Sequence, residues 1–103
     1  MTKNHSYYLD LAYQIAENNL GKTGLNPSVG AIVVKNNSVI SSGITSHRGR
    51  PHAEFNALSK LKNCAGASLY TSLEPCVHYG KTPPCTKIIL KKKIKKVFFG
   101  SYD

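Results

Sequence analysis

Four side chains, drawn from two short segments of the chain, could together bind and use a metal ion. His52 and Glu54 are two positions apart, and Cys76 and Cys85 each directly follow a proline. A catalytic zinc ion takes three protein ligands, drawn from Cys, His and carboxylate groups, and keeps its fourth tetrahedral position for water. His52, Cys76 and Cys85 form such a set of three. The sequence therefore predicts a catalytic zinc centre.

Glu54 is predicted to carry protons rather than to bind the metal. It lies on the first turn of a helix expected over 52–61, where it can share the pocket without ligating zinc. The pattern H-x-E, then P-C, then a second Cys is typical of enzymes that replace an exocyclic amino group on a nucleobase-like ring by oxygen. The helix macrodipole alone also favours a carboxylate there. However, two of only five acidic residues fall inside these motifs, which favours a catalytic role.

A closed structural zinc site is the alternative, and it would require a fourth ligand. His78 is the only nearby candidate in the sequence, and Glu54 would then have no function. Cys64 has no neighbouring Pro or His, so we interpret it as a core or surface thiol outside the metal site. We interpret Glu74 as a structural carboxylate that holds the backbone amides of the loop presenting Cys76.

The segment between the two cysteines departs from the usual P-C-x-x-C pattern, because eight residues separate Cys76 from Cys85. Residues 73–85, L-E-P-C-V-H-Y-G-K-T-P-P-C, resemble the deaminase domain of bacterial bifunctional riboflavin-biosynthesis enzymes, as do N-P-S-V-G at 26–30 and H-A-E at 52–54. The resemblance covers nearly the whole chain. It implies zinc-dependent hydrolytic deamination of diaminohydroxyphosphoribosylaminopyrimidine, in which a ring amino group is exchanged for a carbonyl oxygen.

The resemblance also implies a set of substrate contacts. Asn26, His78 and Lys81 match positions that contact the substrate in similar proteins, and the backbone amide of Ala53 matches one that touches the ring oxygen. Lys81 suits the ribose phosphate because an ammonium is a compact point charge. By analogy with the family, Glu54 takes a proton from the attacking water, passes it to a ring nitrogen and finally protonates the departing ammonia.

Two departures from the family pattern affect these expectations. Many relatives place a substrate-contacting His two residues after the glycine that ends the second strand, where this chain has Thr45; His47 is the other candidate for that role. The chain ends at Asp103, where relatives continue with further helix and strand and commonly with an NADPH-dependent reductase domain. We therefore expect residues 1–103 to form a zinc-dependent deaminase domain that is incomplete at its C-terminus, with NADPH relevant only if a reductase domain follows.

Length and charge limit the remaining possibilities. With 103 residues, of which 41% are hydrophobic, the chain suits one small globular domain. The net charge is +9, and seven lysines lie between Lys81 and Lys96. A lysine-rich helix end is favoured by the helix dipole, and Ile94 and Val97 interrupt the run with core-type side chains. We therefore interpret this run as a solvated helix end that leads into a strand, rather than as a nucleic-acid patch.

Compartment and partners follow from what the sequence lacks. It has no signal peptide, no apolar run near eighteen residues and no disulfide framework, so we expect a cytoplasmic protein without a membrane partner. The expected partner is the phosphoribosylated pyrimidine; nucleic acid is disfavoured, and homo-oligomerisation is left open. Two rival functions remain. One is a tRNA adenosine or other nucleobase deaminase, against which the Cys spacing argues, and the other is a zinc-stabilised nucleic-acid binding module. His5 has no motif support and is expected to be solvated.

The elements that must position these residues follow from hydrophobic periodicity and turn signals. The sequence predicts helices near 5–20, 52–61 and 86–93, strands at 30–34, 39–44, 68–73 and 96–99, a hairpin turn at Asn36-Asn37 and a loop over 21–28. The order αββαβαβ indicates an α/β protein with helices on both sides of a mixed sheet, matching the three-layer cytidine deaminase-like fold that the motifs imply. Two helix N-termini should then point at one metal, where their positive ends favour thiolate and hydroxide.

Overall fold

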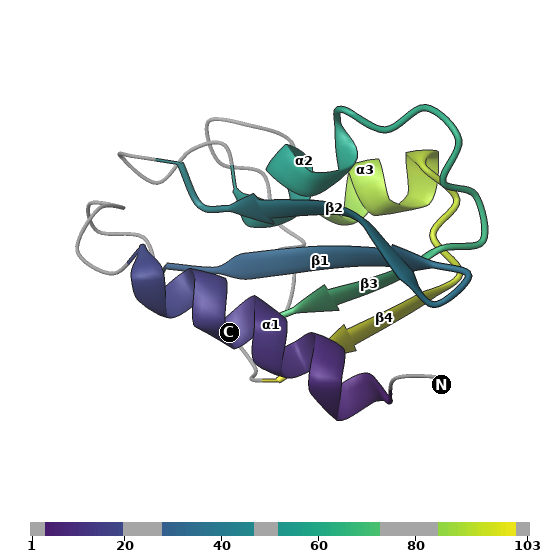
Figure 1. Cartoon of the computed structure of the whole chain (residues 1–103). Helices are drawn as coiled ribbons and strands as arrows, with labels where there is room; N and C mark the ends of the chain where they lie inside the picture. Colours follow the sequence, from purple (N-terminus) through teal and green to yellow (C-terminus); the bar gives the residue numbers. More distant parts are fainter. Residues whose placement is uncertain (1–3, 20–27, 47–51, 73–84, 101–103) are drawn as a thin grey trace.

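The computed structural model describes residues 4–19, 28–46, 52–72 and 85–100, which form one sheet with helices on both faces (Figure 1). The elements are, in chain order, α1 (His5–Asn18), β1 (Gly30–Lys35), β2 (Ser38–Ile44), α2 (Ala53–Leu58), β3 (Ser68–Thr71), α3 (Cys85–Lys91) and β4 (Lys96–Phe99). The predicted order of helices and strands is confirmed. The second helix is shorter than predicted and spans six residues, while most of the predicted loop at 21–28 lies outside the described residues.

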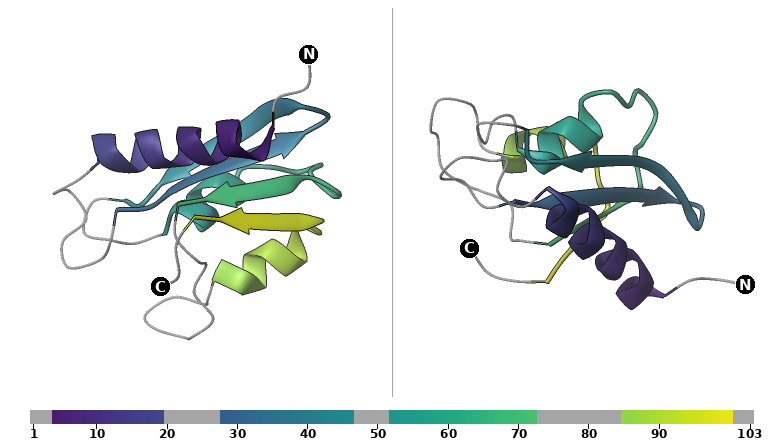
Figure 2. Two further views of the ribbon diagram at one scale, coloured as in Figure 1. Left: turned by 90° about the horizontal axis from the view of Figure 1, so that it is seen from below. Right: turned by 60° about the vertical axis from the view of Figure 1, so that its left-hand side comes forward.

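Strand directions decide which ends of the elements meet. The sheet order is β2-β1-β3-β4; β1 is antiparallel to both neighbours, and β3 and β4 are parallel. Strands β2, β3 and β4 therefore all run the same way, opposite to β1. Their carboxyl ends lie at one edge together with the start of β1, and α2 and α3, each of which follows one of these strands, begin on that side (Figure 2). In open α/β sheets this edge is where ligands bind.

Both faces of the sheet are covered, which explains the continuous apolar run of β1. Alternate residues point to opposite faces of a strand, so each face receives half of the run. The cluster facing α2 and α3 includes Ala31, Val33, Ala57, Leu58, Cys64, Leu69 and Ile89. The cluster facing α1 comprises Tyr8, Ala12, Ile32, Val34 and Tyr70. The prediction of a mixed sheet between two helical layers is confirmed.

Cys64 lies in the core, as one of the two sequence interpretations proposed. Its side chain is 1% exposed, and its thiol donates a weak hydrogen bond to the carbonyl oxygen of Lys92, with Sγ 3.7 Å from that oxygen. The hairpin turn at Asn36 and Asn37 is also confirmed, with φ of 53° and 62°. Two consecutive left-handed residues are typical of the tight hairpin turn that matches strand twist.

The lysine run forms a solvated helix end, as predicted. Lys91 lies in the last turn of α3, Lys93 follows in the left-handed region with φ of 58°, and Ile94 and Val97 pack partly buried against the core. No helix in the described ranges is both long and apolar enough to cross a membrane.

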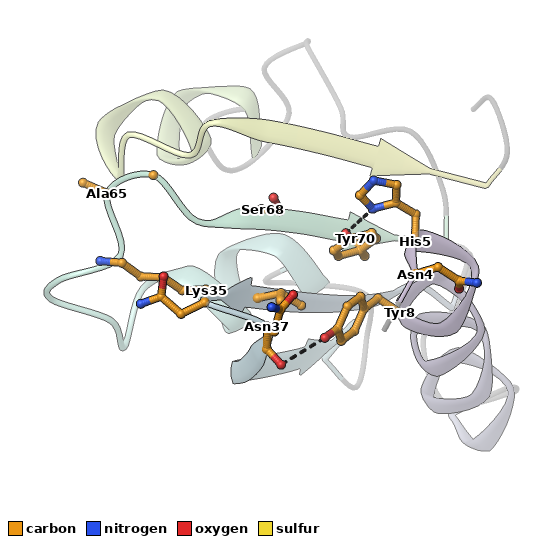
Figure 3. A pocket seen from close by; sticks show the side chains of 11 residues that line it. Asn4, His5, Tyr8, Lys35, Asn37, Ala65, Ser68 and Tyr70 are labelled. Atoms are coloured by element: carbon orange, nitrogen blue, oxygen red, sulfur yellow. Dashed lines mark hydrogen bonds between the residues drawn. The ribbon is translucent and has the colours of Figure 1, made fainter. Parts of the chain in front are cut away.

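The expectation that His5 is exposed to solvent is confirmed, and the structure adds contacts that the sequence did not predict. His5 is exposed at one edge, but its ring stacks on Phe98 with centroids 4.1 Å apart, and its Nδ1 is hydrogen-bonded to the Tyr70 hydroxyl at 2.5 Å (Figure 3). Burial, followed by the charge of Tyr8, raises the pKa of Tyr70 above its ordinary value, so the hydroxyl keeps its proton at neutral pH. The contact joins residues 65 positions apart, which is why local sequence patterns could not predict it.

Candidate functional site

The first turn of α2 presents the H-A-E motif at the carboxyl edge of the sheet. His52 is the N-cap of α2, with extended backbone at φ −72° and ψ 164°, and its carbonyl oxygen accepts the first helical hydrogen bond, from the Asn56 amide at 3.0 Å. Ala53 is fully buried and Glu54 is 3% exposed. The amides of a helix's first turn have no intrahelical partner, and the dipole there favours negative charge. Glu54 is therefore a nearly water-excluded residue two positions after a potential metal ligand.

Backbone packing against β2 holds α2 in this position. A Cβ added to Gly43 would lie 2.5 Å from both the carbonyl oxygen of Ala53 and the amide nitrogen of Ala57. Two hydrogen bonds reinforce this approach: the Ser41 hydroxyl donates to the Ala57 carbonyl at 2.6 Å, and the Asn56 side-chain amide donates to the Ile44 carbonyl at 2.6 Å. Gly43 thus positions the turn that carries the motif. The sequence does carry a signal for this role, because a glycine inside a strand indicates close backbone approach, but Gly43 is not among the residues predicted from it.

We expect Gly43→Ala to destabilise the protein by about 1–3 kcal/mol, as overpacking of a filled interface does. The added methyl group would meet backbone atoms rather than flexible side-chain ends, so α2 must move away from β2. Urea unfolding of Gly43→Ala measures this loss, and Ser42→Ala, at the exposed neighbouring position, is the control. Equal stability of the two variants would show that α2 is not held by this contact.

Thr45 belongs to a hydrogen-bonded network at the same edge. It is 1% exposed; its hydroxyl oxygen accepts a hydrogen bond from the Val29 amide at 2.9 Å, and its own amide donates to the Val29 carbonyl at 3.0 Å. The Asn19 side-chain amide donates to the Thr45 carbonyl at 2.6 Å. Thr45 therefore anchors Val29, the residue just before β1 and two positions after Pro27, and its hydroxyl is hydrogen-bonded to backbone. The other candidate, His47, lies outside the described residues.

A second pair of bonds extends this network to β3. The Gly30 amide donates to the Ser72 hydroxyl at 3.1 Å, and the Ser72 amide donates to the Gly30 carbonyl at 3.0 Å. Ser72 is 6% exposed and is the last described residue before the segment that contains Cys76. Thr45, which precedes His47, is thus bonded to Val29, and Ser72, which precedes the segment containing Cys76, is bonded to Gly30 at the start of β1.

Two of the predicted zinc ligands lie at the starts of helices. His52 is the N-cap of α2, Cys85 is the first residue of α3, and these two helices contact each other on one face of the sheet. Asn26, Cys76, His78 and Lys81 lie outside the described residues, as does the side chain of Cys85. Within the described ranges no three His, Cys, Asp or Glu side chains gather closely enough to hold a metal.

The residues at this edge nevertheless fit zinc by their chemistry. An imidazole at one helix N-terminus and a cysteine at a second one supply the donor types that Zn²⁺ prefers. The positive ends of both helices favour the thiolate form that binds the metal. Glu54 is buried two residues after His52, in the first turn of α2.

Comparisons with known proteins agree with this arrangement. The family model described as the cytidine and deoxycytidylate deaminase zinc-binding region matches residues 2–101. The riboflavin biosynthesis protein RibD of Bacillus amyloliquefaciens is 45% identical over 98 residues, which make up 94% of this chain and 26% of that protein. A diaminohydroxyphosphoribosylamino-pyrimidine deaminase of Buchnera aphidicola is 37% identical and covers 97% of this chain and 69% of its own length.

A solved structure of similar sequence has the same fold. The diaminohydroxyphosphoribosylaminopyrimidine deaminase/5-amino-6-(5-phosphoribosylamino)uracil reductase of Thermotoga maritima superposes with a TM-score of 0.87 at 42% identity, over 94% of this chain and 29% of that one. The chain therefore spans between a quarter and a third of the length of this Thermotoga protein. The predicted three-layer α/β fold is confirmed.

Proposed function

The chain belongs to the zinc-binding family of cytidine and deoxycytidylate deaminases, and from this premise we propose that it deaminates diaminohydroxyphosphoribosylaminopyrimidine in riboflavin biosynthesis. The observation that carries the proposal is the buried Glu54 carboxyl group two residues after His52, at the edge where Cys85 begins a second helix. The choice of substrate is supported by the Buchnera deaminase, because this chain matches it over most of that protein's length. The spacing between Cys76 and Cys85 supports the same substrate.

His52, Cys76 and Cys85 would hold one zinc ion, and bound zinc would supply the Lewis acidity that makes water a competent nucleophile at neutral pH. The chain's own contribution begins with placement. His52 is held by the N-cap geometry of α2, and α2 is held by its backbone contact with Gly43. Because Cys85 opens α3, its thiol would lie near the positive end of that helix, which favours the deprotonated ligand.

Glu54 would move the protons of the reaction. Water adds its oxygen to the amino-bearing ring carbon and gives up a proton, which Glu54 accepts and passes to the neighbouring ring nitrogen. When the carbon–nitrogen bond breaks, Glu54 delivers the second proton of the water to the departing amine, which leaves as ammonia. The carboxyl group is 3% exposed, so bulk water competes little for these protons.

The substrate would be oriented by groups from three segments. The Ala53 amide lies in the first turn of α2, where helical geometry supplies no partner, so it can donate to the ring oxygen. Asn26 would read the ribose or the ring edge from a segment that the Thr45 network anchors at Val29. Lys81 would bind the phosphate as a point charge, and His78 would contact the substrate from the same loop.

Ammonia release from four compounds tests the proposed substrate class in the protein that carries this sequence. We expect fast release from the phosphorylated diaminopyrimidine, release at a much higher KM from its dephosphorylated form, and little from cytidine or adenosine. The difference in KM follows because the unphosphorylated compound cannot use the charge of Lys81. Faster release from adenosine than from the pyrimidine would instead support a tRNA adenosine deaminase.

A further inference from the structure

Lysines from three separate segments gather at the end of the molecule opposite the candidate active site. A cavity of about 440 Å³ is lined by Lys35 at the end of β1, by Lys62 after α2, and by Lys91, Lys92 and Lys93 at the end of α3. Strand β1 runs from Gly30 at the proposed active-site edge to Lys35 in this cavity. At about 3.3 Å per residue the two ends are roughly 17 Å apart, so the cavity is a separate site.

Backbone bonds fix the segments that present these lysines. The Gly66 amide donates to the Lys93 carbonyl at 2.9 Å, and the Lys95 amide donates to the Ala67 carbonyl at 2.8 Å. The Lys92 ammonium donates to the Leu61 carbonyl at 2.5 Å. The end of α3 is therefore joined to the loop between α2 and β3, and the backbone segments that carry these lysines are held in a defined arrangement.

Helix electrostatics explain only part of this cluster. The C-terminus of α3 favours cations in its last turn, which accounts for Lys91 and its neighbours. Lys35 and Lys62 come from other elements, so the dipole of α3 does not account for them. No carboxylate lines the cavity, because the acidic residues of the described ranges are Asp10 and Glu17 on α1 and Glu54 in α2. Like charges gathered without a counter-charge repel one another, and a polyanion would relieve that repulsion.

A second hollow adjoins the first and has a different chemistry. It has a volume of about 640 Å³, shares Lys35 and Ala65 with the lysine cavity, and is lined by the polar side chains of Asn4, Asn36 and Asn37 (Figure 3). The rings of Tyr8 and Tyr70 in its wall are buried, whereas the His5 ring is exposed, so the hollow offers amides and one imidazole. Amide groups both donate and accept hydrogen bonds, which suits the edges of bases and the hydroxyls of ribose.

We propose that these two hollows form a binding surface for single-stranded nucleic acid. Phosphates would lie along the lysine cavity, and a base or ribose would enter the amide-lined hollow. A nucleic-acid strand alternates charged phosphates with polar heterocyclic bases, which matches the lysine cavity and the adjoining amide-lined hollow. An acidic peptide would use only the lysines. The inference goes beyond the proposed deaminase function, because it involves none of the residues assigned to that reaction.

Fluorescence anisotropy with a labelled oligouridylate tests the proposal on the full chain. If the five lysines of the cavity each neutralise one phosphate, log K should fall with log salt at a slope of about −3.5, since single strands give about −0.7 per contact. Lys62→Gln with Lys91→Gln should then reduce the slope by about 1.4. Lys60→Gln with Lys87→Gln removes the same charge outside the cavity and should change the slope little, with circular dichroism confirming that both variants fold.

Three results would overturn the proposal. One is absence of binding at about 50 mM salt, where such contacts are strongest. Another is an equal loss of slope in both double variants, which would assign the effect to net charge alone. The third is equal competition by poly-glutamate of the same charge, which would favour an acidic protein partner instead. The same binding assay on Glu54→Gln separates the two ideas, because binding should persist when deamination is lost.

Discussion

Replacing Cys85 by alanine should leave the purified protein essentially free of zinc after dialysis, and therefore inactive. A zinc centre with three protein ligands loses most of its zinc affinity when one thiolate is removed. Even the loss of a hydrogen-bond partner of a ligand lowers metal affinity by about 10–100-fold. The same result is expected for Cys76→Ala. Metal content per chain, measured by mass spectrometry of the digested protein, gives the answer directly, and thermal unfolding shows how much stability the metal contributed.

Cys64→Ala is the matched control, because it also removes one thiol. Cys64 is 1% exposed in the cluster facing α2 and α3, and its thiol is bonded to the Lys92 carbonyl. This variant should keep its zinc while losing some stability to the small cavity that it leaves. If both variants retain zinc equally, Cys85 is not a ligand and the proposed metal site is wrong.

Glu54→Gln should reduce deaminase turnover by at least about 10²-fold, the usual contribution of a positioned general acid–base group. Glutamine keeps the size and shape of the side chain in a site that is 3% exposed, but it cannot accept the proton of the attacking water. Zinc content and fold should survive, because the three other side chains suffice for the metal. Steady-state ammonia release and metal analysis on one preparation measure both quantities.

Asp10→Asn is the control for the change in charge, since Asp10 is exposed on α1, which packs on the opposite face of the sheet from α2. It should leave turnover near the starting value. Loss of zinc in Glu54→Gln would show that Glu54 is a ligand. Near-normal turnover with zinc retained would contradict the proton-carrying role and the deaminase mechanism built on it.

Local patterns in the sequence were enough to predict the elements and the position of the motif. The apolar run of β1 and the two asparagines that follow it determine a buried strand and a tight turn within a few residues of chain. His52 and Glu54 are two positions apart, so their shared place at a helix start follows from short-range geometry. The order of elements then restricts the sheet to few topologies, because connections between neighbouring strands are short and right-handed.

Contacts between distant segments were decided only by the tertiary structure. Gly43 matters because α2 crosses β2 at that residue, and Thr45 became an anchor because the register of β1 and β2 sets it against Val29. His5 gained Tyr70 as a partner across 65 positions. Periodicity reports whether a side chain is buried, but not which side chain it meets.

The lysines show the same division. Their number and the net charge of +9 are properties of the sequence, which by itself indicates a solvated helix end. That Lys35 and Lys62 join the end of α3 around one cavity depends on strand order and on the backbone bonds between residues 66–67 and residues 93–95. Charge is additive along a chain, whereas a binding surface requires charges from separate elements to converge, and only packing brings them together.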